Sequence, residues 1–267
     1  MNYKWNKLYE YPKSMRSLIN DARHYEVGEE KLPSVTTILS ATQSAEKRAS
    51  LAKWKQKVGE KEAEFIKNDA GLRGTAMHNY LEHHVEGQGL LDLTETGVEA
   101  KKMAETIIDQ GFKDLEEIWG SEVTLYYPGL YAGATDLCGI YMGRESIIDF
   151  KQSNKPKRAE YIEDYKLQMV AYATAHNYVY NTDIDQGVIL MCTPATEVNL
   201  YKNIFQRFII TGSEFREYKW KWLERVDQYY KIKAEQNKNQ LPDSSHEGRE
   251  TRNEGRDKVE NIDLFKE

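Results

Sequence analysis

The sequence predicts an α+β protein in which helices pack on a mixed β-sheet. Three observations support this class: a helix-forming first third, three β-branched and aromatic runs in the middle, and a return to alternating helix and strand afterwards. Of the 267 residues, 40% are apolar, which is enough for one sizeable core. We expect one domain over residues 1–232, with an added helical part at 30–90 and a core at 118–232.

The first third of the chain is rich in helix formers and poor in breakers. Residues 34–39 follow Pro33 and fit either a short strand or the capped start of a helix. Beyond them, the apolar spacing predicts one helix over residues 45–67, a second over 71–85 and a third over 97–111.

The middle of the chain predicts three consecutive strands, Glu122–Tyr127, Tyr131–Met142 and Ser146–Lys151. Pro128-Gly129 and the segment around Gly143 are typical of hairpin turns, so the strands should be antiparallel neighbours. A helix, two strands and a final amphipathic helix should follow, at 158–180, 187–192, 204–210 and 213–233.

From residue 233 onward, mixed charge, Asn, Gln, Ser and Gly replace any apolar period. Such a segment buries too little surface to offset its ordering entropy, so we expect a disordered tail over 233–267. The tail ends with Ile262, Leu264 and Phe265, which resemble the Q-L-x-L-F peptide that binds bacterial sliding clamps. A sliding-clamp contact is one interpretation of these residues, and a frayed terminus or one that folds back on its own sheet is the other.

Composition excludes several classes of protein. The two cysteines, Cys138 and Cys192, cannot form a disulfide framework, a four-cysteine zinc site or a four-cysteine iron–sulfur cluster. The formal charge of −6 argues against coating of nucleic acid by the whole surface, so a nucleic-acid site must be a local patch. We find no apolar run long enough for a membrane span and no signal peptide, and we expect a cytoplasmic protein.

The strongest chemical pattern is Gly133-Ala134-Thr135-Asp136 followed by Asp149-Phe150-Lys151. Alternation along a strand directs Asp149 and Lys151 to one face and Phe150 to the other. Pairing through the turn near Gly143 then places Asp136 opposite Asp149. Two adjacent carboxylates repel each other unless a cation lies between them, and Mg²⁺ or Mn²⁺ is the cation that oxygen ligands favour.

Two helical pairs accompany these residues. His78 and Glu82 lie at i and i+4, so the histidine could bind the metal while the glutamate fixes its ring. Gln168 and Tyr172 share one face of a later helix, from which Gln168 could bind a substrate phosphate or the Lys151 amine. For each pair alone, an ordinary hydrogen-bonded helix face is the competing interpretation.

Taken in order, G-x-x-G-x-x-x-H-x-x-x-E, G-x-x-D, I-D-F-K-x-S and Q-x-x-x-Y resemble the PD-(D/E)xK nuclease superfamily, in its RecB-like branch. Five further blocks resemble the family of the mitochondrial genome maintenance exonuclease and its bacterial and phage relatives. These blocks are LPSVTTILSAT, LAKWKQ, IDFKQSNKPK, LQMVAYATAHN and YKWKWLERVDQYYK. The resemblance covers about residues 30–232, and one departure is Thr135 where proline precedes the aspartate.

The resemblance implies an αβββαβ nuclease core with added N-terminal helices and a metal-dependent deoxyribonuclease. Asp136, Asp149, the Phe150 carbonyl and His78 would bind Mg²⁺ or Mn²⁺, and Lys151 and Gln168 would complete the catalytic set. The expected substrate is single-stranded DNA with a free end. Because we find no transit segment before the match, we expect a bacterial or phage protein of replication, recombination or repair.

The residues themselves also favour a DNA substrate. Residues 46–61 carry six basic and two acidic side chains with Trp54, and residues 151–159 carry four basic and no acidic side chains. Basic side chains bind phosphates and aromatic faces stack on unpaired bases, although a solvated helix face is an equal alternative for 46–61. The residues that we expect to contact DNA are Ser34, Thr36, Lys53, Trp54, Arg73, Ser153, Lys155, Lys157 and Tyr172.

Two alternatives stay open at this point. One is a nuclease specific for double-strand ends or for particular structures, similar to lambda exonuclease or the CRISPR-adaptation nucleases. The other is a DNA-binding module of the same fold without catalysis.

Overall fold

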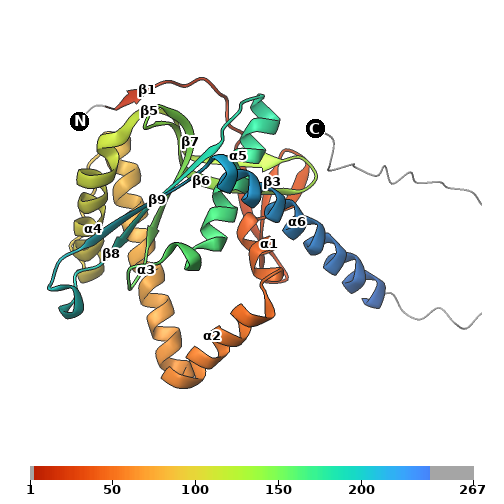
Figure 1. Cartoon of the computed structure of the whole chain (residues 1–267), viewed down its shortest axis with the longest axis horizontal. Coiled ribbons are helices and arrows are strands. Elements are labelled where there is room, and N and C mark those ends of the chain that lie inside the picture. The colour runs from red at the N-terminus through yellow and green to blue at the C-terminus, as the bar shows by residue number, and fades with distance from the viewer. Residues whose placement is uncertain (1–2, 241–267) are drawn as a thin grey trace, which may run out of the picture.

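The computed structural model describes residues 3–240, and within them the α+β class is confirmed. A mixed six-stranded sheet has the order β1-β5-β6-β7-β8-β9, and a separate three-stranded sheet has the order β2-β3-β4 (Figure 1). The strands are β1 (Lys4–Trp5), β2 (Ser14–Ile19), β3 (Ala22–Val27), β4 (Glu30–Pro33), β5 (Leu115–Tyr127), β6 (Tyr131–Tyr141), β7 (Arg144–Gln152), β8 (Gln186–Thr193) and β9 (Ile204–Thr211). The helices are α1 (Val35–Ala41), α2 (Ala45–Val58), α3 (Glu60–Val85), α4 (Glu95–Gly111), α5 (Glu163–Tyr180) and α6 (Gly212–Gln240), with short 3₁₀ turns at Phe112–Asp114, Ala159–Tyr161 and Glu197–Asn199.

The main sheet separates two hydrophobic cores. Helices α3 and α4 cover one face, where Met77 and Met103 pack with Ile148 and Phe150 of β7. Helices α1, α5 and α6 cover the other face, which receives Ile147. Neighbouring residues of β7 therefore enter opposite cores, as the period of two in a strand requires.

The hairpin that joins β6 to β7 fixes the register of the central strands. Met142 and Gly143 form a two-residue turn with φ angles of +50° and +73°, the left-handed conformation that tight hairpins need. Pairing runs from Tyr141↔Arg144 to Leu137↔Ile148. Strands β5, β6 and β7 are consecutive and antiparallel, so this part of the prediction is confirmed.

The predicted break between the first two long helices is wrong in position. We expected it between residues 67 and 71, but α3 runs through both Gly71 and Gly74. The break falls at Gly59, whose φ of +89° ends α2 and precedes α3. Among residues 3–240, no helix has an apolar stretch that would span a bilayer.

Both ends of the described chain also differ from expectation. Helix α6 continues to Gln240, so the expected disorder from residue 233 is wrong at its start, because Lys, Ala, Glu and Gln sustain a helix without an apolar period. The proposed clamp-binding residues Ile262, Leu264 and Phe265 lie outside the described residues. The sheet β2-β3-β4 was not predicted, and it packs Tyr25 and Leu32 against Ala132 of β6.

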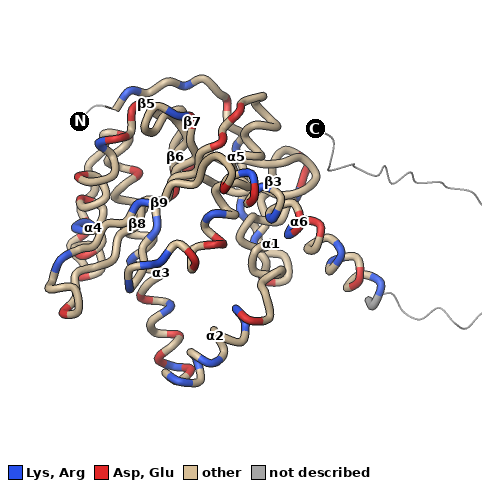
Figure 2. The backbone as a smooth tube through the Cα atoms, viewed as in Figure 1, with Lys and Arg blue, Asp and Glu red and all other residues tan. Residues whose placement is uncertain are grey.

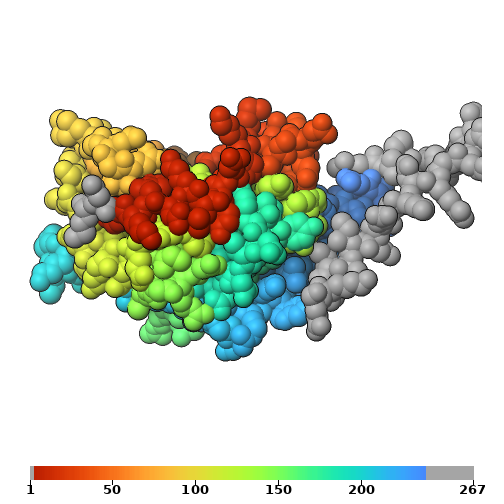
Figure 3. Space-filling model, turned by 90° about the horizontal axis from the view of Figure 1, so that it is seen from above, coloured from red at the N-terminus to blue at the C-terminus, as the bar shows by residue number. Residues whose placement is uncertain are grey.

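Residues 6–13 connect β1 to β2 along the surface of the molecule (Figure 3). Their inward side chains include Tyr9 and Tyr11, which surround His176 of α5 together with Tyr180. The hydroxyl of Tyr11 lies 3.2 Å from Nε2 of His176, and Nδ1 of His176 lies 2.8 Å from the hydroxyl of Thr182. The N-terminal segment is thereby attached to the α5 side of the sheet.

Candidate active site

A cavity of about 710 Å³ lies where α3, β6, β7 and α5 meet. The structure brings nine of the predicted residues to its wall: Ser34, Thr36, His78, Glu82, Asp136, Asp149, Lys151, Gln168 and Tyr172. We call this space the active-site cavity.

The two aspartates are buried, with 7% of Asp136 and 2% of Asp149 exposed. The register of the hairpin places them opposite each other, one position beyond the last pair Leu137↔Ile148. The backbone N–H of Phe150 donates to Oδ2 of Asp136, and the Lys151 ammonium pairs with Asp149. The Phe150 ring packs in the opposite core, as predicted from the strand period.

His78 approaches the carboxylates from α3. Its Nδ1 lies 3.1 Å from Oδ1 of Asp136. Burial opposes the charged imidazole, but attraction and hydrogen bonding to the Asp136 carboxylate, together with attraction to Asp149, raise the pKa of His78 overall. Nδ1 of this ring faces Asp136 of β6, and the role of Glu82 in fixing the ring stays a prediction. Glu82 lines the cavity, and burial raises its pKa.

Glu122 of β5 was not identified from the sequence. The pairs Ser121↔Leu137 and Val123↔Thr135 flank it, so it lies opposite Asp136, with a left-handed φ of +51°. One possible ligand atom from each of Glu122, Asp136 and His78 lies within 4.8 Å of the others. Burial, followed by repulsion from Asp136, raises the pKa of Glu122 to about 8.

These side chains fit a divalent metal ion. Glu122, Asp136 and Asp149 gather carboxylates in a buried place, and burial raises the pKa of Asp149 to about 6. A cation would relieve this crowding of negative charge. Carboxylate oxygens with one imidazole suit Mg²⁺ or Mn²⁺, which prefer oxygen ligands and retain waters.

Gln168 and Tyr172 lie on the α5 wall of the cavity. Nε2 of Gln168 donates a hydrogen bond of 2.9 Å to the Tyr172 hydroxyl. A Cβ atom at Gly133 would lie 2.5 Å from Cε1 of Tyr172, so the aromatic ring leaves no room for a side chain there. This contact gives a physical reason for the glycine in the G-x-x-D pattern.

Several of the residues predicted to contact DNA lie at the wall of the active-site cavity or on the surface of the molecule. Ser34 and Thr36 line the active-site cavity, although the Ser34 hydroxyl also accepts the N–H of Thr37 and caps α1. Residues 34–39 thus adopt the helical alternative. Lys53 and Trp54 are exposed on α2, Lys155 is exposed after β7, and Lys157 is partly buried there.

The prediction that Arg73 and Ser153 contact DNA is corrected, because both side chains are buried and neither lines the active-site cavity. The Arg73 guanidinium bonds to the side chains of Asp69, Glu99, Gln152 and Asn154. The Ser153 hydroxyl donates to the carbonyl of Lys155. Both residues therefore hold the end of β7 in place.

The unpredicted three-stranded sheet adds positive charge to the cavity. Arg16, Arg23 and Tyr25 line it from β2 and β3. Arg16 lies over the Tyr25 ring, with 5.6 Å between its Cζ and the ring centroid. No pattern in residues 1–33 indicated this, because the contribution depends on where the small sheet packs.

The curated proteins that match this chain are exonucleases. They are mitochondrial genome maintenance exonuclease 1 of Homo sapiens, 27% identical over 228 residues, and of Mus musculus, 28% identical over 215 residues. The alignments cover 77% and 74% of this chain, and the chain spans about 60% of the length of these relatives. No family model matches the chain.

The resemblance inferred from the sequence is thereby confirmed, and one prediction is corrected. We expected a bacterial or phage protein of the cytoplasm, whereas the matching proteins, including one from Xenopus tropicalis at 27% identity, are animal proteins named as mitochondrial. Among solved structures, the crystal structure of SSO0001 aligns with a TM-score of 0.39 and 13% identity, covering 78% of this chain and 79% of that one.

Proposed function

We propose that this chain is a Mg²⁺- or Mn²⁺-dependent deoxyribonuclease of the PD-(D/E)xK type. The observation that carries the proposal is the meeting of Asp136, Asp149, Lys151 and Gln168 in one cavity. The order α4-β5-β6-β7-α5-β8 fits an αβββαβ core, and the matching relatives are named as exonucleases.

In this proposal, Asp136, Asp149 and the Phe150 carbonyl hold the cation, with Glu122 and His78 at its margin. When bound, the cation supplies a Lewis acid for the phosphate and lowers the pKa of a water molecule. The protein contributes the fixed positions of these groups, since both aspartates are buried on neighbouring strands.

Lys151 positions the attacking water and balances charge on the phosphate. Asp149 pairs with its ammonium, which also lies 5.3 Å from the centroid of the Tyr165 ring. Gln168 presents its amide to a phosphate oxygen from the α5 wall. Water displaces the 3′ oxygen of the cleaved phosphodiester, whose negative charge these donors stabilise.

We further propose single-stranded DNA with a free end as the substrate. Helices α2 and α3 form a V that projects from the body of the molecule (Figure 1), and several positions along the backbone of α2 are Lys or Arg (Figure 2). No residue of α2 is buried, and Lys47 near its start pairs with Asp164 of α5. Both arms of the V join the body of the molecule, α2 through the ion pair of Lys47 and α3 through the wall of the active-site cavity. We therefore propose that a single strand is threaded under the V from its end and that a duplex is a poorer substrate.

Digestion of end-labelled DNA tests both parts of the proposal. With Mg²⁺ or Mn²⁺, linear single strands should be degraded, duplexes should react more slowly and circular single strands should be spared. A chelator should stop the reaction. Absence of metal-dependent cleavage on every substrate would contradict the nuclease assignment, while rapid nicking of circles would contradict the need for an end.

A further inference from the structure

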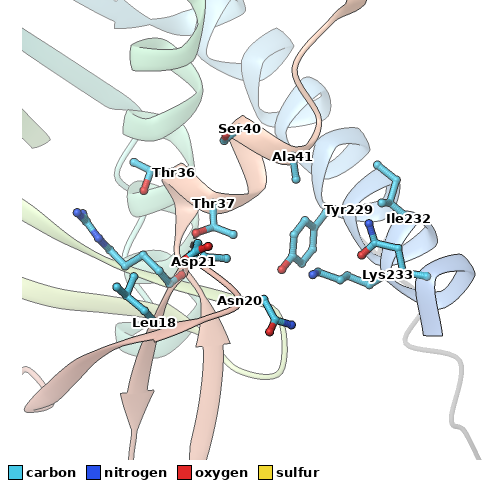
Figure 4. A pocket seen from close by; sticks show the side chains of 13 residues that line it. Leu18, Asn20, Asp21, Thr36, Thr37, Ser40, Ala41, Tyr229, Ile232 and Lys233 are labelled. Atoms are coloured by element: carbon cyan, nitrogen blue, oxygen red, sulfur yellow. Dashed lines mark hydrogen bonds between the residues drawn. The ribbon is translucent and has the colours of Figure 1, made fainter. Parts of the chain in front are cut away.

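A second cavity of about 410 Å³ adjoins the active site on the side of the small sheet. Figure 4 shows Tyr229 and Lys233 of α6 and Asn20 of the β2-β3 hairpin tip around this space. Arg23 and Thr36 line both this cavity and the active-site cavity. The two cavities therefore adjoin at these two side chains, and we call the second one the α6 cavity.

The lining of the α6 cavity suits a sugar-phosphate chain. Arg23 and Lys233 contribute two cations, and Asp21 contributes one acid. Within residues 3–238, neither cation forms an ion pair. The remaining polar lining includes the hydroxyls of Thr36, Ser40 and Tyr229 and the amides of Asn20 and Gln236, whereas the Thr37 hydroxyl already donates to the carbonyl of Arg23. Such donors bind phosphate and sugar oxygens without reading the base.

The aromatic residue of this cavity does not offer a stacking surface. Tyr229 is only 2% exposed, and Lys233 lies over its ring at 5.7 Å from the centroid. Bases are bound by single-strand proteins through accessible aromatic faces, so a base would gain little here. The cavity is therefore suited to the backbone of a strand and to any sequence.

We propose that the α6 cavity binds the nucleotide of a DNA strand that adjoins the nucleotide held in the active-site cavity. Arg23 binds the phosphate at the junction, and Lys233 binds the next phosphate. The volume lies within the roughly 300–1,000 Å³ of small-ligand sites, which is adequate for one nucleotide. This inference rests on the proposed nuclease function, because the strand reaches the α6 cavity from the active site.

Binding of a fluorescent oligothymidylate to the full chain carrying Lys151→Ala tests this proposal without cleavage. Adding Lys233→Ala should weaken binding about tenfold, and the slope of log affinity against log salt concentration should become shallower by about 0.7, as expected for one lost phosphate contact on a single strand. Arg23→Ala should have a similar effect. Lys231→Ala is the matched control, since Lys231 is exposed on the same helix and pairs with Asp227.

The possible failures are distinguishable. If the Lys233→Ala and Lys231→Ala proteins bind alike with the same salt slope, the α6 cavity holds no nucleotide and the proposal is overturned, while the nuclease assignment stands. If the Lys151→Ala protein itself binds no single-stranded DNA, both the proposed function and this inference are overturned. A loss of affinity for the oligothymidylate that is confined to the Lys233→Ala and Arg23→Ala proteins supports the proposal.

Discussion

Nδ1 of His78 lies 3.1 Å from Oδ1 of Asp136, and this contact joins helix α3 to the centre of the sheet. The same aspartate accepts the N–H of Phe150 from the neighbouring strand. Asp136 therefore contacts a strand and a helix at once, so a substitution on α3 that moves His78 should also shift the position of the Asp136 carboxylate.

The first prediction concerns Asp149 and Lys151, the proposed catalytic pair. Asp149→Asn removes one charge from the proposed metal site, and Lys151→Ala removes the ammonium that we propose positions water. Each should lower the cleavage rate at least about a hundredfold while the protein stays folded. Asp183→Asn and Lys113→Ala are exposed controls that should behave as the parent. Parent-like turnover by either active-site variant would place the chemistry elsewhere.

The second prediction concerns Glu122. If this carboxylate helps to hold the cation, Glu122→Gln should raise the Mg²⁺ concentration for half-maximal activity by about tenfold or more. Without metal, the same variant should melt no lower than the parent, because one of the crowded carboxylates is gone. Metal titrations and melting curves with Glu145→Gln as the exposed control check both effects. A loss of stability without metal would show that Glu122 has a structural role instead.

The third prediction concerns Gly133. Gly133→Ala places a methyl group against the Tyr172 ring, so we expect a loss of about 1–3 kcal/mol in the free energy of unfolding, with reduced cleavage. Chemical denaturation measures the first effect and a rate assay the second. Gly89→Ala is the matched control, since no atom lies within 4 Å of its added Cβ. Equal stability of the two variants would show that the ring moves aside without cost.

The fourth prediction concerns the buried His176. Burial lowers its pKa to about 4, whereas an unfolded histidine titrates near 6.5. Between these values the unfolded chain binds more protons, so stability falls as the pH drops from about 6.5 to 4, by on the order of 3 kcal/mol. His176→Asn should remove this part of the pH dependence. Denaturation midpoints at several pH values, with His24→Gln as a partly exposed control, test this. The same acid sensitivity in the His176→Asn protein would refute it.

Local patterns predicted the strand geometry at the centre of the candidate site. The alternation of Asp149, Phe150 and Lys151 depends only on the period of a strand, and the hairpin register follows from the short turn at Gly143. Each of these features is determined within about fifteen residues of sequence. The contacts made by His78 and Gln168 were harder to define. The sequence indicated the helix face on which each residue lies, but not what that face packs against.

Two of the missed features depend on distant parts of the chain. Glu122 becomes part of the site through pairing of β5 with β6, and Arg23 through packing of the small sheet. Arg73 was predicted to contact DNA because the sequence motif does not show which acidic side chains lie beside it in the fold, namely Asp69 and Glu99. The helix break was misplaced because Gly59 and Gly71 look alike in sequence, and only Gly59 adopts a positive φ.

The two-residue turn at Met142-Gly143 has a consequence for the evolution of this chain. Inserting or deleting one residue there would slip β7 by one position against β6, and every side chain of β7 would change faces. Phe150 would then face the active-site cavity, and Asp149 and Lys151 would enter the apolar core under α3 and α4. The turn touches no proposed substrate group, yet its length should tolerate change as poorly as the identity of the carboxylates.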